Sequence, residues 1–160
     1  MDDRTFRQAM GQFATGVTIV TTEYEKNVHG MTANAFMSVS LNPKLIAVSV
    51  DHRAKMLRKM IEAQTFAVNI LTERQKELSM LFAGQIKLEK TPTFARLHGV
   101  PIIEDSLVSV VCRLFSKKVA GDHTIFIGEV IDIKTRKGEP LLFYSGNYYR
   151  LSSSMEVRPV

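Results

Sequence analysis

Cysteine is almost absent from this chain. Its 160 residues include a single one, Cys112, which excludes an internal disulfide framework and any cluster of thiolate metal ligands. Cys112 lies in an apolar stretch with Val111 and Leu114. Free cysteine is among the most buried residue types, so we expect a packed, inert core thiol here rather than a nucleophile.

Long apolar runs are also missing. No run approaches the roughly 20 apolar residues that span a bilayer, and the N-terminus, from Met1 to Arg4, lacks the basic stretch and apolar core of a secretory signal. We therefore expect a cytoplasmic protein that does not associate with membranes. At 160 residues and 18.0 kDa, the chain is expected to form a single domain, residues 1–160, with one core.

Several signature motifs do not occur. There is no Gly-x-Gly-x-x-Gly after a strand, so a nicotinamide cofactor is not held by a Rossmann loop, and there is no Gly-x-x-x-x-Gly-Lys-Ser/Thr phosphate loop. His-Glu-x-x-His and Gly-x-Ser-x-Gly are absent as well. The histidines never fall at paired metal-ligand spacing, so we expect no metal site.

The chain is basic, with a net charge of +5 and a pI of about 9.4. Its basic residues are scattered among acidic ones, and no helix-turn-helix, zinc-finger or RNA-recognition signature accompanies them. We therefore do not expect nucleic-acid binding. A modest positive field equally suits anionic small molecules such as phosphorylated cofactors.

Apolar periodicity predicts more strands than helices. Helices are expected over residues 4–13, 54–63 and 73–82, the last capped by Thr72 and stopped by Gly84. Residues 85–99 are expected to form a loop with short helical pieces, and residues 31–40 an irregular extended stretch. One strand is expected to begin near residue 28. Further strands are expected over residues 17–22, 45–50, 66–71, 107–115, 124–134 and 140–144.

These strands come in runs with few helices between them, which differs from the regular alternation of a doubly wound sheet. The pattern favours a mainly β fold: a closed or split antiparallel β-barrel with peripheral helices.

The strongest local signal for chemistry is the segment from His29 to Ser40. Short polar side chains stand at Thr32, Asn34, Ser38 and Ser40, which would give an extended strand one polar face. Small residues at Gly30, Ala33 and Ala35 would let a flat ligand such as an isoalloxazine ring approach the backbone. A solvated strand face has the same pattern, and spacing alone does not decide between the two.

Three further segments carry a functional and a structural interpretation. Gly121-Asp122 predicts a tight turn that projects His123 from the start of a strand, either toward an anionic ligand or toward a local partner. The helix end at 79–84 is either a ligand-lining segment or an ordinary glycine stop. The aromatic cluster at 143–150 is either core packing or a stacking wall.

Taken in this order, the four segments resemble the short-chain flavin reductase family, the reductase components of two-component flavin-dependent monooxygenases. The likeness extends from Phe6 to about Leu151 and is greatest toward reductases that serve a phenol 2-hydroxylase. It rests on Phe-Ala-Thr-Gly-Val-Thr-Ile-Val-Thr at 13–21, Gly-Met-Thr-Ala-Asn-Ala-Phe at 30–36, Phe-Ala-Gly at 82–84, Gly-Asp-His at 121–123 and Tyr-Ser-Gly-x-Tyr at 144–148.

This resemblance implies a split β-barrel of the FMN-binding type with Greek-key antiparallel topology, forming a homodimer with two flavin sites near the interface. It assigns the nicotinamide substrate to His123 and Tyr148, and the flavin phosphate to Ser49, Val50 and Lys55. The complete implied set of flavin-binding residues is Thr32, Ala33, Asn34, Ser38, Ser40, Ser49, Val50, Lys55, Phe82, Ala83 and Gly84.

The implied activity is hydride transfer from NADH to FAD, with NADPH and FMN as alternatives, to supply reduced flavin to a separate monooxygenase that hydroxylates an aromatic such as phenol. No protein residue is expected to be catalytic, because the cofactors carry the chemistry. Thr32 and Asn34 are expected to donate hydrogen bonds to the polar edges of the flavin. Two alternatives remain open: a flavin-binding carrier or sensor without turnover, and an oxidase of the pyridoxamine-phosphate type on the same barrel.

Overall fold

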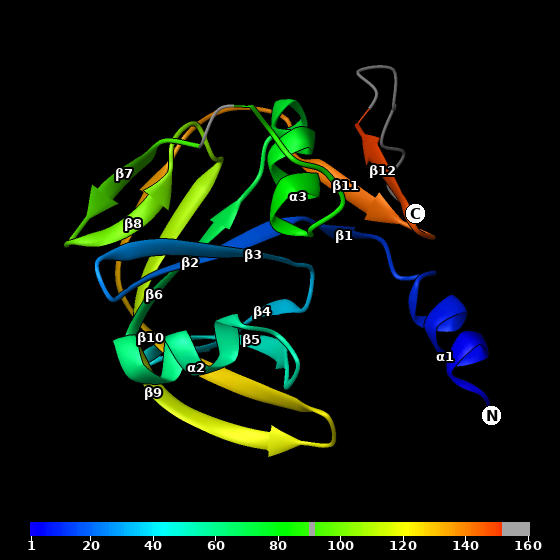
Figure 1. Cartoon of the computed structure of the whole chain (residues 1–160), viewed down its shortest axis with the longest axis horizontal. Helices are drawn as coiled ribbons and strands as arrows, with labels where there is room; N and C mark the ends of the chain where they lie inside the picture. Colours follow the sequence, from blue (N-terminus) through cyan, green and yellow to red (C-terminus); the bar gives the residue numbers. More distant parts are fainter. Residues whose placement is uncertain (90–91, 152–160) are drawn as a thin grey trace.

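The computed structural model describes residues 1–89 and 92–151, and its largest element is a seven-stranded antiparallel sheet (Figure 1). Hairpins at the β2–β3, β4–β5 and β9–β10 connections supply most of its pairing. In spatial order the strands are β3 (Asn27–Ala33), β2 (Thr18–Tyr24), β6 (Thr65–Ile70), β9 (Val108–Ala120), β10 (His123–Thr135), β5 (Lys44–Asp51) and β4 (Phe36–Leu41).

Two smaller sheets accompany it. A three-stranded sheet has the order β1 (Thr15–Gly16), β11 (Leu141–Tyr144), β12 (Asn147–Arg150), and a ribbon is formed by β7 (Phe94–Leu97) and β8 (Val100–Ile103). The helices are α1 (Asp3–Met10), α2 (Met56–Ala63) and α3 (Lys76–Phe82), the last preceded by the 3-10 turn η1 (Glu73–Gln75).

The large sheet curls into a barrel that stays split. Its two edge strands, β3 and β4, follow each other in the chain and are joined only by Asn34 and Ala35, yet they belong to opposite ends of the strand order. The Ala35 carbonyl accepts a hydrogen bond from the Ser49 N–H at 3.1 Å, which fixes this corner to β5. Helix α2 packs against β2, β3, β5 and β6. The prediction of a mainly β, split antiparallel barrel is confirmed.

The main core lies between α2 and the barrel strands. Met56 and Met60 of α2 are buried against Phe66 and Phe126 of the sheet. Cys112 lies in the same cluster with no exposed surface, and burial raises the pKa of its thiol to about 12. The expected inert core thiol is confirmed.

A fully buried amide joins four strands. The side-chain amide of Asn69 on β6 donates to the Ile19 carbonyl at 2.9 Å and to Thr21 Oγ1 at 3.0 Å on β2. Its Oδ1 accepts from the Ile103 N–H at 3.0 Å on β8 and from Ser109 Oγ at 2.9 Å on β9. Asn69 therefore has the full set of four hydrogen bonds that an amide side chain makes.

Most of the predicted elements are present, with three corrections. Residues 85–99 were expected to form a loop with helical pieces, but they contain strand β7, whose Ala95 and Leu97 pack against the buried residues of β8. Residues 31–40 divide between β3 and β4 instead of forming one extended stretch. The helix expected at 73 begins as a 3-10 turn, in which the Gln75 side chain accepts a hydrogen bond from the N–H of Thr72 at 3.0 Å.

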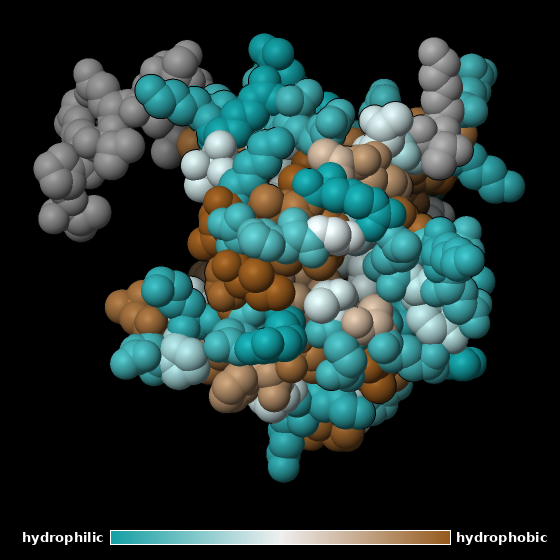
Figure 2. All heavy atoms as spheres, turned by 90° about the vertical axis from the view of Figure 1, so that its left-hand side faces the viewer, coloured by the Kyte–Doolittle hydropathy of each residue, from teal (hydrophilic) through white to brown (hydrophobic). Residues whose placement is uncertain are grey.

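Apolar groups on the surface are concentrated on particular elements. The face in Figure 2, on the side of β7, β8 and the β2–β3 turn, is mostly hydrophilic and has an apolar band across its middle. Large exposed apolar side chains occur on α1 (Phe6 and Met10) and on β4 (Met37 and Leu41). In Figure 1, α1 lies on the opposite side of the molecule from β7 and β8. Within residues 1–89 and 92–151, no helix has both the length and the apolar character needed to cross a bilayer.

Replacement of Asn69 tests the buried amide. Asn69→Ala removes four hydrogen bonds to three other strands and leaves buried partners unpaired, so we expect it to lower the free energy of unfolding by about 4 kcal/mol. Asn27→Ala is the matched control, because that exposed amide bonds only the nearby Glu25 carbonyl, and it should change stability by less than about 0.5 kcal/mol. Urea denaturation measures both, and equal stabilities of the two variants would contradict the role given to Asn69.

Candidate functional site

A small pocket opens beside the corner between β3 and β4. Its volume is about 170 Å³, and its walls come from the end of β3, the segment after α3, and the three-stranded sheet. The residues that line it are Val17, Thr32, Ala33, Asn34, Ala83, Gln85, Phe143 and Tyr148. The pocket thus brings together five of the predicted site residues, from three of the four sequence segments.

The size of the pocket limits what it can hold. Pockets that enclose a drug-sized ligand measure about 300–1,000 Å³, whereas this one measures about 170 Å³. It therefore has room for one ring or one edge of a larger aromatic system, and the remainder of such a ligand would lie outside. Ala33 and Phe143 provide apolar surface there, while Asn34 and Gln85 provide exposed amides.

The polar wall of the pocket is organised by Ser79, a fully buried residue of α3. Thr32 Oγ1 donates to the Ser79 carbonyl at 2.6 Å, and Ser79 Oγ is hydrogen-bonded to the Tyr148 hydroxyl at 2.8 Å. We expected the Thr32 hydroxyl to donate to a flavin. Its one hydrogen is directed at Ser79, so toward a ligand this oxygen can act only as an acceptor.

Tyr148 is held from three sides. Its hydroxyl meets Ser79, its ring lies edge-on to Phe143 with centroids 5.3 Å apart, and Lys76 Nζ lies 5.7 Å from its ring centroid. The core-packing interpretation of the aromatic cluster is confirmed for these two rings, because they pack against the core around Leu71. They also line the pocket, and the stacking wall stays a prediction.

Phe82 lies behind the pocket. Its ring covers Gly30, where an added Cβ would lie 2.6 Å from two of its ring carbons, and it packs at 6.2 Å from the Phe94 ring. The small residue at Gly30 thus accommodates a flat ring of the protein itself, not a ligand. Gly84 follows the helix with a φ of +72°, which confirms the predicted stop.

The other predicted residues lie along β4 and β5. Ser38 and Ser40 are on β4, but a register shift between them disrupts the expected alternation of polar side chains. Ser49 is half-buried on β5, where it is joined to the corner through Ala35. Val50 is fully buried, so it can offer a ligand only its backbone.

Strand β5 leads to the β9–β10 turn, where His123 pairs across the ladder with Asp51. His123 Nδ1 lies 2.7 Å from Asp122 Oδ1. Hydrogen bonds from Arg53 hold the pKa of the Asp51 carboxyl well below its usual range. Lys55 then precedes α2, whose N-terminus has no side-chain cap.

The predicted residues therefore form two groups that meet at Ala35 and Ser49. Figure 1 shows them along one side of the molecule, with β12 above, the β3–β4 corner in the middle and the β9–β10 turn below. Tyr148 and His123, both predicted to contact the nicotinamide, lie at opposite ends of this side. One chain does not bring them together.

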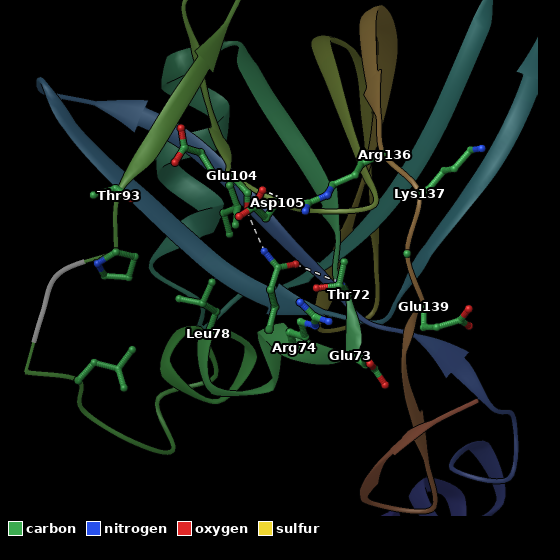
Figure 3. A pocket seen from close by; sticks show the side chains of 15 residues that line it. Thr72, Glu73, Arg74, Leu78, Thr93, Glu104, Asp105, Arg136, Lys137 and Glu139 are labelled. Carbon is green, nitrogen blue, oxygen red and sulfur yellow. Dashed lines mark hydrogen bonds and ion pairs between the residues drawn. The ribbon is translucent and has the colours of Figure 1, made fainter. Parts of the chain in front are cut away.

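A larger hollow lies elsewhere, around the start of α3. Its volume is about 810 Å³, and Figure 3 shows Thr72 and Leu78 on one side of it and Asp105 and Arg136 on another. None of the predicted site residues lines it. Its charged lining mixes the cations Arg74, Arg136 and Lys137 with the carboxylates Glu73, Glu104, Asp105 and Glu139. These charges nearly balance, so they do not mark this hollow as a site for a phosphorylated cofactor. The smaller pocket, which five of the predicted residues line, is therefore the candidate site.

Residues 10–152 match the model of the flavin reductase like domain. The chain belongs to that family. It is 45% identical over 148 residues to an NADH-dependent flavin reductase of a Rhodococcus species, covering 91% of this chain and 84% of that protein. It is 37% identical over 147 residues to the reductase component of the 4-hydroxyphenylacetate 3-monooxygenase of Thermus thermophilus, covering 91% and 95%.

Solved structures of the family agree in fold. The flavin reductase PheA2 is 56% identical in sequence and superposes with a TM-score of 0.93, covering 96% of this chain and 100% of that one.

Sequence reasoning missed several pocket residues of this flavin reductase-like chain. Gln85 lies in the segment with the least pattern, and Val17 resembles an ordinary strand residue. Phe143 belongs to the aromatic cluster at 143–150 but is not among the predicted site residues. Ser79 stands within a quoted segment, but only the structure reveals its two partners.

Replacement of Gly30 tests the contact with Phe82. In Gly30→Ala the new Cβ must displace the ring, so we expect a loss of about 1–3 kcal/mol of stability and weaker flavin binding as the end of α3 shifts. Gly16→Ala is the control, because an added Cβ there meets nothing within 4 Å. Thermal unfolding and flavin fluorescence titration measure the two effects, and wild-type flavin affinity in Gly30→Ala would refute the coupling.

Proposed function

We propose that this chain is an NADH-dependent flavin reductase that transfers a hydride from NADH to FAD and supplies reduced flavin to a separate monooxygenase. An aromatic such as phenol is the proposed substrate of that oxygenase. The observation that carries this proposal is the row of predicted flavin residues along one side of the molecule, from the pocket at Thr32 to the start of α2 at Lys55.

The residues along this row fit a flavin. The pocket accepts one edge of a ring system, with the amides of Asn34 and Gln85 as hydrogen-bonding groups and the Thr32 oxygen as an acceptor. At the other end, the uncapped N-terminus of α2 and the exposed Lys55 suit a phosphate. FAD and NADH are the proposed pair because the family resemblance favours them.

The protein's part in the reaction is to bind and orient. The bound flavin accepts the hydride and the nicotinamide provides it, so the chain needs no nucleophile. Phe143 and Val17 give the pocket apolar surface, and Tyr148 forms another part of its wall. Holding two reacting rings in contact supplies a large part of the barrier lowering in reactions of this kind.

We also propose a homodimer of single-domain chains, residues 1–160, in the cytoplasm. Helix α1 has no buried residue in the single chain, and its apolar side chains Phe6 and Met10 are 51% and 58% exposed. Strand β4 exposes Met37 and Leu41 beside the predicted flavin residues Ser38 and Ser40. Because exposed apolar patches of this kind mark interaction sites, a second copy on this side would cover them and bring the flavin near the interface.

The central prediction concerns turnover. The purified protein should oxidise NADH only when FAD or FMN is present, as measured by the loss of NADH absorbance. Folded protein that consumes no NADH with either flavin would exclude the reductase. A flavin that binds and stays oxidised after rapid mixing with NADH would point instead to a carrier or sensor.

His123 is predicted to contact the nicotinamide substrate. His123→Ala should raise the KM for NADH about tenfold, the loss expected for one hydrogen bond to a charged group, while the Kd for flavin stays near its wild-type value. His98→Ala is the matched control, because His98 is also an exposed histidine paired with an aspartate, at 3.0 Å from Asp132. An unchanged KM for NADH in His123→Ala would remove this residue from the site.

A further inference from the structure

Two walls of the pocket belong to different sheets. Thr32 is on β3 of the seven-stranded sheet, and Tyr148 is on β12 of the three-stranded sheet. Backbone hydrogen bonds join the two sheets around Leu71, whose carbonyl accepts from the Leu141 N–H and whose N–H donates to the Val17 carbonyl, both at 3.0 Å. These bonds involve neither β3 nor β12, the strands that carry Thr32 and Tyr148. The position of the Tyr148 side chain relative to Thr32 therefore needs a determinant of its own.

Ser79 supplies that determinant, because its carbonyl bonds one wall and its hydroxyl bonds the other. Its carbonyl accepts from Thr32 Oγ1 at 2.6 Å, and its hydroxyl is bonded to the Tyr148 hydroxyl at 2.8 Å. Ser79 itself has no exposed surface and does not line the pocket. Both of its side-chain partners do line it.

We propose that Ser79 is a positioning residue of the nicotinamide half of the site. It couples β3 to β12 and so fixes where the Tyr148 ring stands across the pocket. The inference rests on the proposed function, since it gives Tyr148 a role toward NADH. In this proposal Ser79 itself contacts no ligand, and it acts only through Thr32 and Tyr148, which do.

The position of Ser79 on α3 extends this coupling to a third wall. The same helix ends at Phe82 and leads directly into Ala83 and Gln85 of the pocket. A shift of α3 would move Ala83, Thr32 and Tyr148 together, because hydrogen bonds of 2.6 and 2.8 Å tie both strands to the helix. The three walls thus behave as one unit.

Loss of the Ser79 hydroxyl has a specific consequence. The Tyr148 ring keeps its contacts with Phe143 and Lys76, so the fold around it persists. Its hydroxyl loses its partner and turns toward water, and the ring is no longer fixed over the pocket. The expected effect falls on NADH binding rather than on the hydride step.

The test compares Ser79→Ala, Tyr148→Phe and the double variant in the flavin-loaded protein. Each single change should raise the KM for NADH about fivefold, the factor that one neutral hydrogen bond contributes, with kcat and flavin affinity within about twofold of wild type. Because both changes break the same bond, the double variant should show no larger rise than a single one. A wild-type KM in Ser79→Ala, or effects that multiply in the double variant, would overturn the proposal.

Ser109→Ala is the matched control. Ser109 is also a buried serine whose hydroxyl bonds another side chain, but its partner is Asn69 in the core. It should lower stability and leave the KM for NADH unchanged. A rise in KM equal to that of Ser79→Ala would show a general effect of lost stability and refute positioning.

A second pair of variants covers the case in which Ser79→Ala does not fold. Thr32→Val removes the hydroxyl that donates to the Ser79 carbonyl, whereas Thr32→Ser retains it. Only the valine variant should raise the KM for NADH, and equal values for the two would overturn the proposal.

A readout without turnover separates this inference from the proposed function. In protein with 13C-labelled tyrosine, the ring-carbon resonance next to the Tyr148 hydroxyl, assigned with Tyr148→Phe, should shift in Ser79→Ala and not in Ser109→Ala. If wild type consumes no NADH, the proposed function fails, and this shift still decides whether Ser79 positions Tyr148. An unshifted resonance would refute the coupling whatever the activity.

Discussion

Asn34 and Ala35 carry the chain from one edge of the seven-stranded sheet to the other. A two-residue connection is long enough for a hairpin, but β3 pairs with β2 and β4 pairs with β5 rather than with each other, so the barrel stays open at this corner. Helix α2 packs against the strands around it. The corner is fixed by the bond between Ala35 and Ser49. In a closed barrel, the backbone groups at the edges of β3 and β4 would pair with each other. In this split barrel, a ligand that lies along this side can reach those strand ends and their exposed amides.

The site depends on this opening and on α3. The helix places Phe82 over Gly30 and presents Ser79 to both neighbouring sheets, so the pocket is shaped by the protein before any ligand arrives. Such preorganisation lowers the cost of ordering side chains on binding. Strand β4, which exposes apolar groups, also carries Ser38 and Ser40 of the same row, which links the proposed dimer to the proposed flavin site.

Much of this could be predicted from local pattern. The helix start at Thr72, the stop at Gly84 and the buried strand at 45–50 follow from capping, backbone freedom and apolar continuity. The polar face expected from Thr32 to Ser40 was wrong as one strand, because alternation cannot reveal a corner or a bulge. Gly30 was assigned to a ligand because its neighbour in space, Phe82, is far away in the sequence. For the same reason, only the fold shows that His123 and Tyr148 lie apart in one chain.

The burial of Cys112 has a consequence for durability. A reductase that releases reduced flavin in air generates hydrogen peroxide, because free reduced flavin reacts with oxygen. Peroxide attacks thiolates, and the only cysteine of the chain is fully buried, with a thiol pKa of about 12. It therefore stays protonated and out of reach. The peroxide would instead oxidise exposed methionines such as Met10 and Met37, whose sulfoxides cells can repair.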